Sequence, residues 1–246
     1  MCGSRVREVD NSFYDTLGDA WYGDDAHAIA VLRAESAVRV DFVRERLRRE
    51  DVLCDVGAGA GFLAIPLSEH CARIVAVDRS TSSLRVLRAH DAKGSVALIT
   101  ADGFHLPLPD DSIDAVLLMD ILEHVSHPAQ LIAEAARVLR PGGRVLFHTF
   151  NRTLPSWIVV IKAMELFVPK YPRNLHVHRY FITPSELAAH CTAVGLRVEE
   201  LRGLRPVFDA AFFQSIVRRR VLPAFRFRLT SSLAMGYVGV ATAPAR

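Results

Sequence analysis

A glycine-rich turn, DVGAGAG at positions 55–61, follows a short β-rich run and opens a helical pattern. Glycines allow a tight turn and a close approach of ligand to backbone, and the amides at a helix N-terminus face that ligand. Asp78 ends the next β-rich run, about 20 residues further on, where a carboxylate can accept the hydroxyls of a ribose. Taken singly, the turn is also a plain strand-to-helix connection and Asp78 a helix cap. Together they predict a nucleotide site that includes Asp55, Gly57, Gly59, Gly61 and Asp78.

The spacing of the glycines also distinguishes between nucleotides. A dinucleotide-binding turn reads GxGxxG, and its third glycine would stand where this chain has Phe62. The observed GxGxG after Asp55 favours S-adenosylmethionine (SAM), because a sulfonium cofactor has no pyrophosphate and its amino acid end is held by carboxylates and carbonyls. Asp102 is expected to accept a hydrogen bond from the adenine amine. Met119 is expected beneath the ligand, with plain core packing as the alternative.

The elements that must position these residues alternate between β-rich runs and helical patterns, which is typical of parallel strands joined by helical crossovers. The expected strands are 52–56, 73–77, 96–100, 115–119, 144–149, 196–201 and 237–241. The expected helices are 25–50, 62–70, 81–90, 128–139 and 184–194. This order predicts an α/β, Rossmann-like fold with a mostly parallel seven-stranded sheet, helices on both faces and a helical insertion after the fifth strand.

The whole chain, 1–246, is expected to form one domain, since α/β domains of this length commonly share a single core. We divide it into an N-terminal helical segment (1–50), a cofactor-binding core (51–150), an insertion that forms a lid or faces a membrane (151–182) and a C-terminal part that completes the sheet (183–246).

Composition excludes several classes of protein. The net charge of +3 is too small to predict a nucleic-acid partner. The four cysteines form no CxxC pair, so neither a zinc cage nor a disulfide framework is expected. The first ten residues lack the apolar stretch that a signal peptide requires, and no apolar run reaches the ~20 residues that span a bilayer. We therefore expect a cytoplasmic protein that is at most peripheral on the inner face of the cytoplasmic membrane.

The order of the blocks DVGAGAG, VDRS, ADGFHLPLPDDSID, LLMDILEHV and ARVLRPGGRVLF resembles that of class I SAM-dependent methyltransferases. More narrowly, FNR at 150–152, Ser156-Trp157, His176 and PSEL at 184–187 look like the ubiquinone-biosynthesis O-methyltransferases, which methylate a polyprenylated catechol. The chain departs from that family at Val177-His178, where the family has Asp-Trp, and its block at 101–114 looks more like generic small-molecule methyltransferases.

The same resemblance implies residue roles. Trp21-Tyr22 and Leu32-Arg33 match the family's N-terminal region, where an arginine contacts SAM. The resemblance therefore implies that the cofactor contacts include Arg33, Gly57, Asp78 and Met119.

Methyl transfer from a sulfonium is an in-line displacement, so an enzyme must align the acceptor oxygen and remove its proton. His124 lies just past the fourth strand, at the sheet edge where α/β folds bind ligands, and is the candidate general base. The alternative is that His124 only caps or orients a loop.

In relatives, two carboxylates and a histidine of this segment are associated with magnesium, and the resemblance implies Asp120, Glu123 and His124 here. A metal that bridges two catechol oxygens would lower the pKa of one. Asp120 replaces a longer glutamate of the family, and histidine is a poor magnesium ligand.

Two stretches predict contact with an anionic membrane surface. Residues 153–171 are apolar with a tryptophan near one end and scattered lysines, and Arg218, Arg219 and Arg220 follow three phenylalanines. The alternative is a lid packed over the active site beside ordinary solvated arginines.

The leading hypothesis is thus O-methylation of a phenol or catechol, such as a polyprenylated quinone precursor. The alternatives are C- or N-methylation of another small molecule, an NAD-dependent oxidoreductase, or a non-catalytic SAM-binding protein. The sequence leaves open the acceptor and its prenyl length, the number of methylation steps and the oligomeric state.

Overall fold

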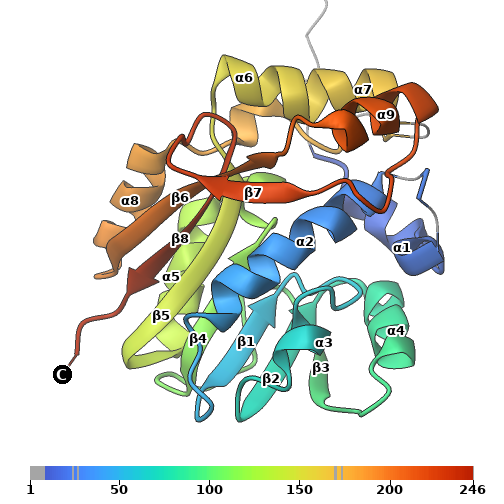
Figure 1. The fold of residues 1–246 in the computed structure, drawn as a ribbon. Helices are drawn as coiled ribbons and strands as arrows, with labels where there is room; N and C mark the ends of the chain where they lie inside the picture. The colour runs from blue at the N-terminus through green and yellow to red at the C-terminus, as the bar shows by residue number, and fades with distance from the viewer. Residues whose placement is uncertain (1–8, 24, 27, 169–170, 173, 246) are drawn as a thin grey trace, which may run out of the picture.

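A computed structural model describes residues 9–245 apart from 24, 27, 169, 170 and 173. Its centre is an eight-stranded sheet in the order β3-β2-β1-β4-β5-β8-β6-β7 (Figure 1). The strands are β1 (Val52–Val56), β2 (Arg73–Asp78), β3 (Val96–Thr100), β4 (Ile113–Met119), β5 (Leu139–Phe150), β6 (Arg197–Pro206), β7 (Phe227–Thr230) and β8 (Gly236–Thr242). The first five are parallel where they pair, and β8 is antiparallel to both β5 and β6.

The predicted Rossmann-like α/β class is confirmed, but the count of seven strands was one too low. The additional strand, β7, is only four residues long and pairs with positions 203–206 of β6. The strand predicted at 196–201 ends before the positions of β6 that pair with β7, so this edge was not anticipated. A short edge strand of this kind depends on its neighbour more than on its own pattern.

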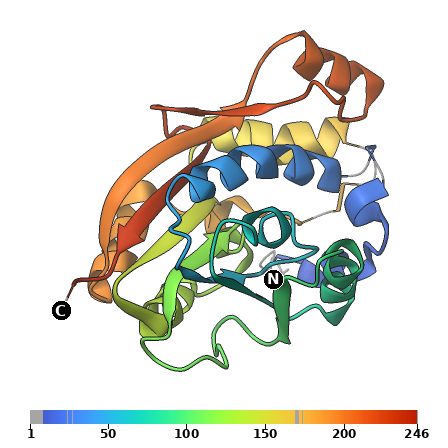
Figure 2. The same cartoon turned by 60° about the horizontal axis from the view of Figure 1, so that its bottom comes forward.

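Helices cover both faces of the sheet, as expected, because successive residues of the central strands point to opposite sides (Figure 2). Leu53 packs on the side of α2 (Ile29–Arg44), α3 (Ala64–Leu67) and α4 (Thr81–His90). Its neighbour Cys54 packs on the side of α5 (Pro128–Val138) and α8 (Pro184–Ala193).

Local signals set the helix ends where the chain carries caps. Thr183 accepts a hydrogen bond from the backbone of Glu186, whose side chain returns to the Thr183 backbone, so α8 begins at Pro184 as predicted. The helix expected over 25–50 is shorter, Ile29–Arg44, and its Ala28 N-cap makes no side-chain cap bond. The spacing of charged and apolar residues therefore predicted a helix that is too long at both ends.

The remaining segments gather at one end of the molecule. The N-terminal region forms the 3-10 helix η1 (Asn11–Thr16) and the short α1 (Ala20–Gly23). The insertion after β5 is nearly continuous helix, made of α6 (Leu154–Ser156), the π-helical η3 (Trp157–Ala163) and α7 (Met164–Phe167). It lies beside α9 (Ala210–Arg218) at the top of Figure 1, and Arg219 donates to the Leu166 carbonyl at 3.4 Å. None of the described helices is long and apolar enough to cross a membrane.

Candidate active site

The candidate site lies at the carboxyl ends of β1, β2 and β4. The chain leaves β1 toward β2 on one side, whereas β4 flanks β1 on the other, so the strand order reverses between β1 and β4. Loops at such a reversal diverge and leave room for a ligand. Both the glycine-rich turn and the segment that begins at Asp120 leave the sheet here.

The glycine-rich turn and Asp78 are physically joined. Gly57 and Gly59 both have positive φ, +76° and +54°, a region open to glycine at no steric cost. The Gly57 amide donates to the Val77 carbonyl at 2.8 Å, and the Gly59 amide donates to Oδ2 of Asp78, also at 2.8 Å. The Ser80 amide donates to Oδ1 at 2.7 Å. These two hydrogen bonds fix the orientation of the carboxylate, and its remaining lone pairs can accept hydrogen bonds from hydroxyl groups.

A cavity of about 170 Å³, here called the cofactor cavity, opens over this turn. The predicted cofactor contacts that line it are Gly57, Gly59, Asp78, Asp102 and Met119. Three other predicted contacts, Arg33, Asp55 and Gly61, are not among its lining residues.

Gly61 and Asp55 lie behind the turn. A Cβ on Gly61 would lie 2.6 Å from Cγ of Leu87, and its φ is +86°, so this glycine lets the turn pack against α4. Asp55 is buried in β1, and its Oδ2 has no hydrogen-bond partner among the described residues. Burial, and then the nearby charge of Asp78, raises the pKa of Asp55 to about 7.

The structure places Arg39, rather than Arg33, at the cofactor cavity. Arg33 pairs with Asp25 at 2.5 Å and donates to the Trp21 carbonyl at 3.1 Å. Arg39 is fully buried, lines the cavity and leaves its Nε without a partner among the described residues. The sequence held a signal for it, since Arg39 is three residues before Phe42 and so falls on the apolar face of the helix.

Asp120 is the centre of a buried ion-pair network. Arg39 binds its Oδ2, and Nδ1 of His148 binds its Oδ1. The other ring nitrogen of His148 lies 3.5 Å from a carboxylate oxygen of Glu35. Burial favours neutral Asp120, but Arg39 and His148 outweigh it and hold the pKa of this carboxyl below its ordinary value. Burial likewise opposes the charge on His148, yet Asp120 and Glu35 raise its pKa.

The residues predicted to hold magnesium do not fit that ion. Both oxygens of Asp120 are engaged, and a dication beside it would face the charge of Arg39. The structure divides the predicted ligands between two groups of close donor atoms, Glu123 with His124 and His176, and Asp120 with Glu123 and His148. The first set has two imidazoles and one carboxylate, which suits a transition metal more than magnesium, because magnesium prefers oxygen ligands. In the second set, the oxygens of Asp120 are already bound by Arg39 and His148.

His124 lies in the 3-10 turn η2 (Leu122–His124) and is almost fully buried. Its Nδ1 has no hydrogen-bond partner among the described residues, and its Nε2 lies 3.4 Å from the hydroxyl of Tyr14. Burial lowers the pKa of His124 to about 4, although the charge of Asp120 opposes that shift. The imidazole is therefore neutral near pH 7, the state in which it can take up a proton.

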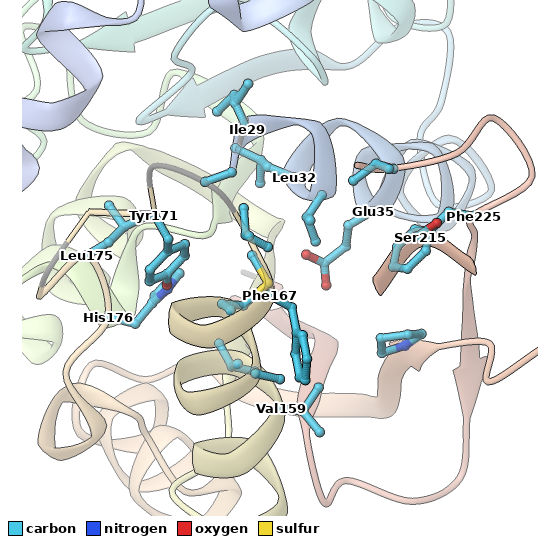
Figure 3. A pocket seen from close by; sticks show the side chains of 18 of the residues that line it. Ile29, Leu32, Glu35, Val159, Phe167, Tyr171, Leu175, His176, Ser215 and Phe225 are labelled. Carbon is cyan, nitrogen blue, oxygen red and sulfur yellow. The ribbon is translucent and has the colours of Figure 1, made fainter. Parts of the chain in front are cut away.

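A second cavity, of about 160 Å³, lies between α2, the insertion and α9, and is here called the apolar cavity. Its wall is mostly aliphatic and aromatic and includes Ile29, Val160, Phe167, Leu175 and Phe212. Figure 3 shows the carboxylate of Glu35 pointing from α2 into this space, opposite the helix that carries Val159 and Phe167. Neither the cavity nor Glu35 was anticipated, because its walls come from segments far apart in sequence.

The two cavities meet. Among the described residues, four line both: Tyr14, Leu32, Asp120 and His124. The cofactor cavity and the apolar cavity therefore adjoin at these four residues.

Comparison with known proteins agrees with this geometry. A family model described as a methyltransferase domain matches residues 54–147. A ubiquinone biosynthesis O-methyltransferase from Hydrogenovibrio crunogenus is 30% identical over 230 residues, which cover 92% of this chain and 89% of the relative. A relative of the same name from Pseudomonas aeruginosa is 31% identical over 207 residues, which cover 82% and 88%.

A solved structure shares the fold. Magnesium protoporphyrin IX methyltransferase from Synechocystis, with bound SAH, superposes with a TM-score of 0.65 over 94% of this chain and 97% of that one, at 16% identity. The order of blocks, the sheet and the sequence relatives thus lead to one conclusion: the chain is a SAM-dependent methyltransferase and belongs to the family of ubiquinone biosynthesis O-methyltransferases.

Proposed function

We propose that this enzyme transfers the methyl group of SAM to an oxygen of a phenol or catechol that carries an apolar, polyprenyl-like chain. The observation that carries the proposal is the junction between the cofactor cavity and the apolar cavity. An apolar chain gains free energy by leaving water for an aliphatic and aromatic wall, which favours such an acceptor over a small polar one. The names of the curated relatives support the same substrate class.

We propose that SAM lies over the glycine-rich turn, where it supplies an electrophilic methyl group on a sulfonium. Asp78 would accept the ribose hydroxyls, and Asp102, near the end of β3, would accept from the adenine amine. Arg39 would hold the carboxylate of the amino acid end, because its charge and unpartnered Nε are at the cavity wall.

His124 is the proposed general base. It lies where the two cavities adjoin and is neutral near pH 7, and among the described residues its Nε2 makes only a long contact, 3.4 Å to the Tyr14 hydroxyl. When His124 takes the acceptor's proton, the nearby charge of Asp120 stabilises the imidazolium. No step depends on magnesium, because both carboxylate oxygens of Asp120 are already engaged.

We further propose that the insertion and α9 face an anionic membrane surface. The insertion turns one side, with Val160 and Phe167, toward the apolar cavity, and exposes Leu154, Ile158 and Leu166 elsewhere. The lid and membrane interpretations are therefore compatible, because one side of the helix lines the cavity while other apolar residues of the same helix are exposed. A substrate dissolved in lipid could then enter the apolar cavity without passing through water.

Product analysis tests the proposal. The enzyme is incubated with methyl-labelled SAM and a panel of catechols that carry zero, one, two or three prenyl units. We expect label on a catechol oxygen and a KM that falls with each prenyl unit, because each adds buried apolar surface. Label on carbon or nitrogen, or a KM that does not change with the number of prenyl units, would contradict the proposed acceptor.

A further inference from the structure

With SAM in the cofactor cavity and the acceptor in the apolar cavity, as proposed above, the methyl group is transferred where the two cavities adjoin. The described residues that line both cavities are therefore the first candidates for contact with the accepting oxygen: Tyr14, Leu32, Asp120 and His124. Leu32 offers no polar side-chain atom. Asp120 has both carboxylate oxygens bound by Arg39 and His148. Tyr14 and His124 remain.

Tyr14 reaches the junction from the N-terminal helix η1. Its hydroxyl lies 3.4 Å from Nε2 of His124, which is long for a hydrogen bond made by a hydroxyl, where about 2.8 Å is usual. The contact is thus loose, and its two atoms are far enough apart for an oxygen to lie within hydrogen-bond distance of both.

The position of Tyr14 is fixed by contacts other than this one. Its ring stacks on Trp21 at 5.8 Å between centroids and meets the His124 ring edge-on at 5.7 Å. Its backbone carbonyl accepts from the Ser83 hydroxyl at 3.3 Å, at the start of α4. Asn11, also in η1, donates to the His124 carbonyl at 3.0 Å. The hydroxyl is therefore held at the junction by η1 and the Tyr14 ring, and removing it leaves these contacts in place.

We infer that Tyr14 is a further catalytic residue, whose hydroxyl donates a hydrogen bond to the methyl-accepting oxygen while His124 takes the proton from that oxygen. This inference rests on the proposed O-methylation. Burial raises the pKa of the Tyr14 phenol well above its usual value, so the hydroxyl keeps its proton and acts as a donor at neutral pH.

The step balances with these groups alone. The acceptor's O–H proton moves to His124, and a lone pair of the oxygen forms the new bond to the methyl carbon. The bond between that carbon and the sulfonium sulfur breaks, and its electron pair stays on sulfur, which becomes a neutral thioether. Tyr14 stabilises the negative charge that develops on the oxygen and keeps its own proton.

The test is Tyr14→Phe, with Tyr180→Phe as the matched control, since Tyr180 loses the same hydroxyl but lines neither cavity. We expect kcat to fall about 10- to 100-fold in Tyr14→Phe, as for one lost hydrogen bond to a developing charge. Thermal midpoint and SAM affinity should stay close to wild type in both variants.

A second measurement uses 4-nitrocatechol bound in the presence of SAH, whose absorbance reports ionisation of the bound phenol. A Tyr14 donor stabilises the phenolate, so the pKa of the bound probe should rise by about one unit in Tyr14→Phe and stay unchanged in Tyr180→Phe. A residue with a purely structural role would not shift it.

The two hypotheses fail differently. If the wild-type enzyme forms no O-methyl product, the proposed function is wrong. If it does form that product, but Tyr14→Phe keeps its turnover and the pKa of the bound probe, the role of Tyr14 is overturned.

Discussion

At the scale of single residues, the site depends on charges buried in pairs. Arg39 and His148 are fully buried and Asp120 is mostly buried, and the two cations are tolerated there because Asp120 pairs with both and Glu35 lies near His148. Arg39 and Asp120 also line the cofactor cavity, where their charges are little screened by solvent. Asp55 differs, because its burial next to Asp78 favours the protonated form.

Two arginines of α2 are candidates for contact with SAM: Arg33, which the family resemblance implies, and Arg39, which lines the cofactor cavity. We expect Arg39→Lys to weaken SAM binding about tenfold, because an ammonium cannot reproduce the fork of a guanidinium at a carboxylate. We expect Arg33→Lys, the matched control, to stay within about twofold, since Arg33 does not line the cofactor cavity. Titration calorimetry with SAM measures both. A larger loss of SAM affinity in Arg33→Lys than in Arg39→Lys would mean that Arg33, as the resemblance implies, is the arginine that contacts SAM.

Asp55 predicts a pH dependence of stability. Its pKa is about 7 in the folded protein and about 4 in an unfolded chain, so between these values the folded state holds a proton that the unfolded state has lost. Stability therefore falls as pH rises through that window. Asp55→Asn removes the ionisation, so its free energy of unfolding relative to wild type should increase from pH 5 to pH 8.

Urea unfolding without SAM at both pH values measures this difference. The control is Asp41→Asn, which changes an exposed carboxylate of α2. Its free energy of unfolding relative to wild type should be the same at pH 5 and pH 8. If the value for Asp55→Asn is also the same at both pH values, the raised pKa assigned to Asp55 is wrong.

At the scale of elements, the insertion and α9 form one layer beside the apolar cavity. Both contribute side chains to the apolar cavity, and both expose large apolar residues, such as Leu166 on α7 and Phe213 on α9. Arg218, Arg219 and Arg220 stand at the end of α9. This combination of apolar side chains and positive charge is suited to an anionic lipid surface.

Vesicle sedimentation tests that surface. We expect binding to vesicles that contain anionic lipid and little binding to neutral ones, because each basic residue near the surface contributes about 1 kcal/mol. Changing Arg218, Arg219 and Arg220 to Glu should abolish it. As a control with the same change in charge, Arg48, Arg49 and Arg197, exposed residues outside this layer, are changed to Glu. Equal binding by the two triple variants would mean that net charge, and not this surface, governs the interaction.

At the scale of the whole molecule, the sheet and the elements around it contribute to different cavities. The carboxyl edge of the sheet holds the turns that line the cofactor cavity, whereas η1, the insertion and α9 contribute side chains to the apolar cavity. The first cavity depends largely on local sequence patterns, and the second depends on how distant segments pack together.

The sequence alone determined the fold class and the family, and five of the predicted cofactor contacts lie together in one cavity. A glycine turn and a carboxylate after the next strand are local patterns with local physical causes, and Gly57, Gly59, Asp78, Asp102 and Met119 all line the cofactor cavity. Helix caps such as Thr183 likewise act within a few residues, so α8 begins where it was predicted.

Only the tertiary structure decided which arginine lines the cofactor cavity, how Asp120 is paired and where the apolar cavity lies. Arg39 and Arg33 differ by less than two turns of one helix, so their roles depend on which side packs against the sheet. Tyr14 and His124 are 110 residues apart in sequence, and no local pattern records their contact. The apolar cavity depends on the same long-range packing, because its walls come from elements that meet only after the sheet has formed.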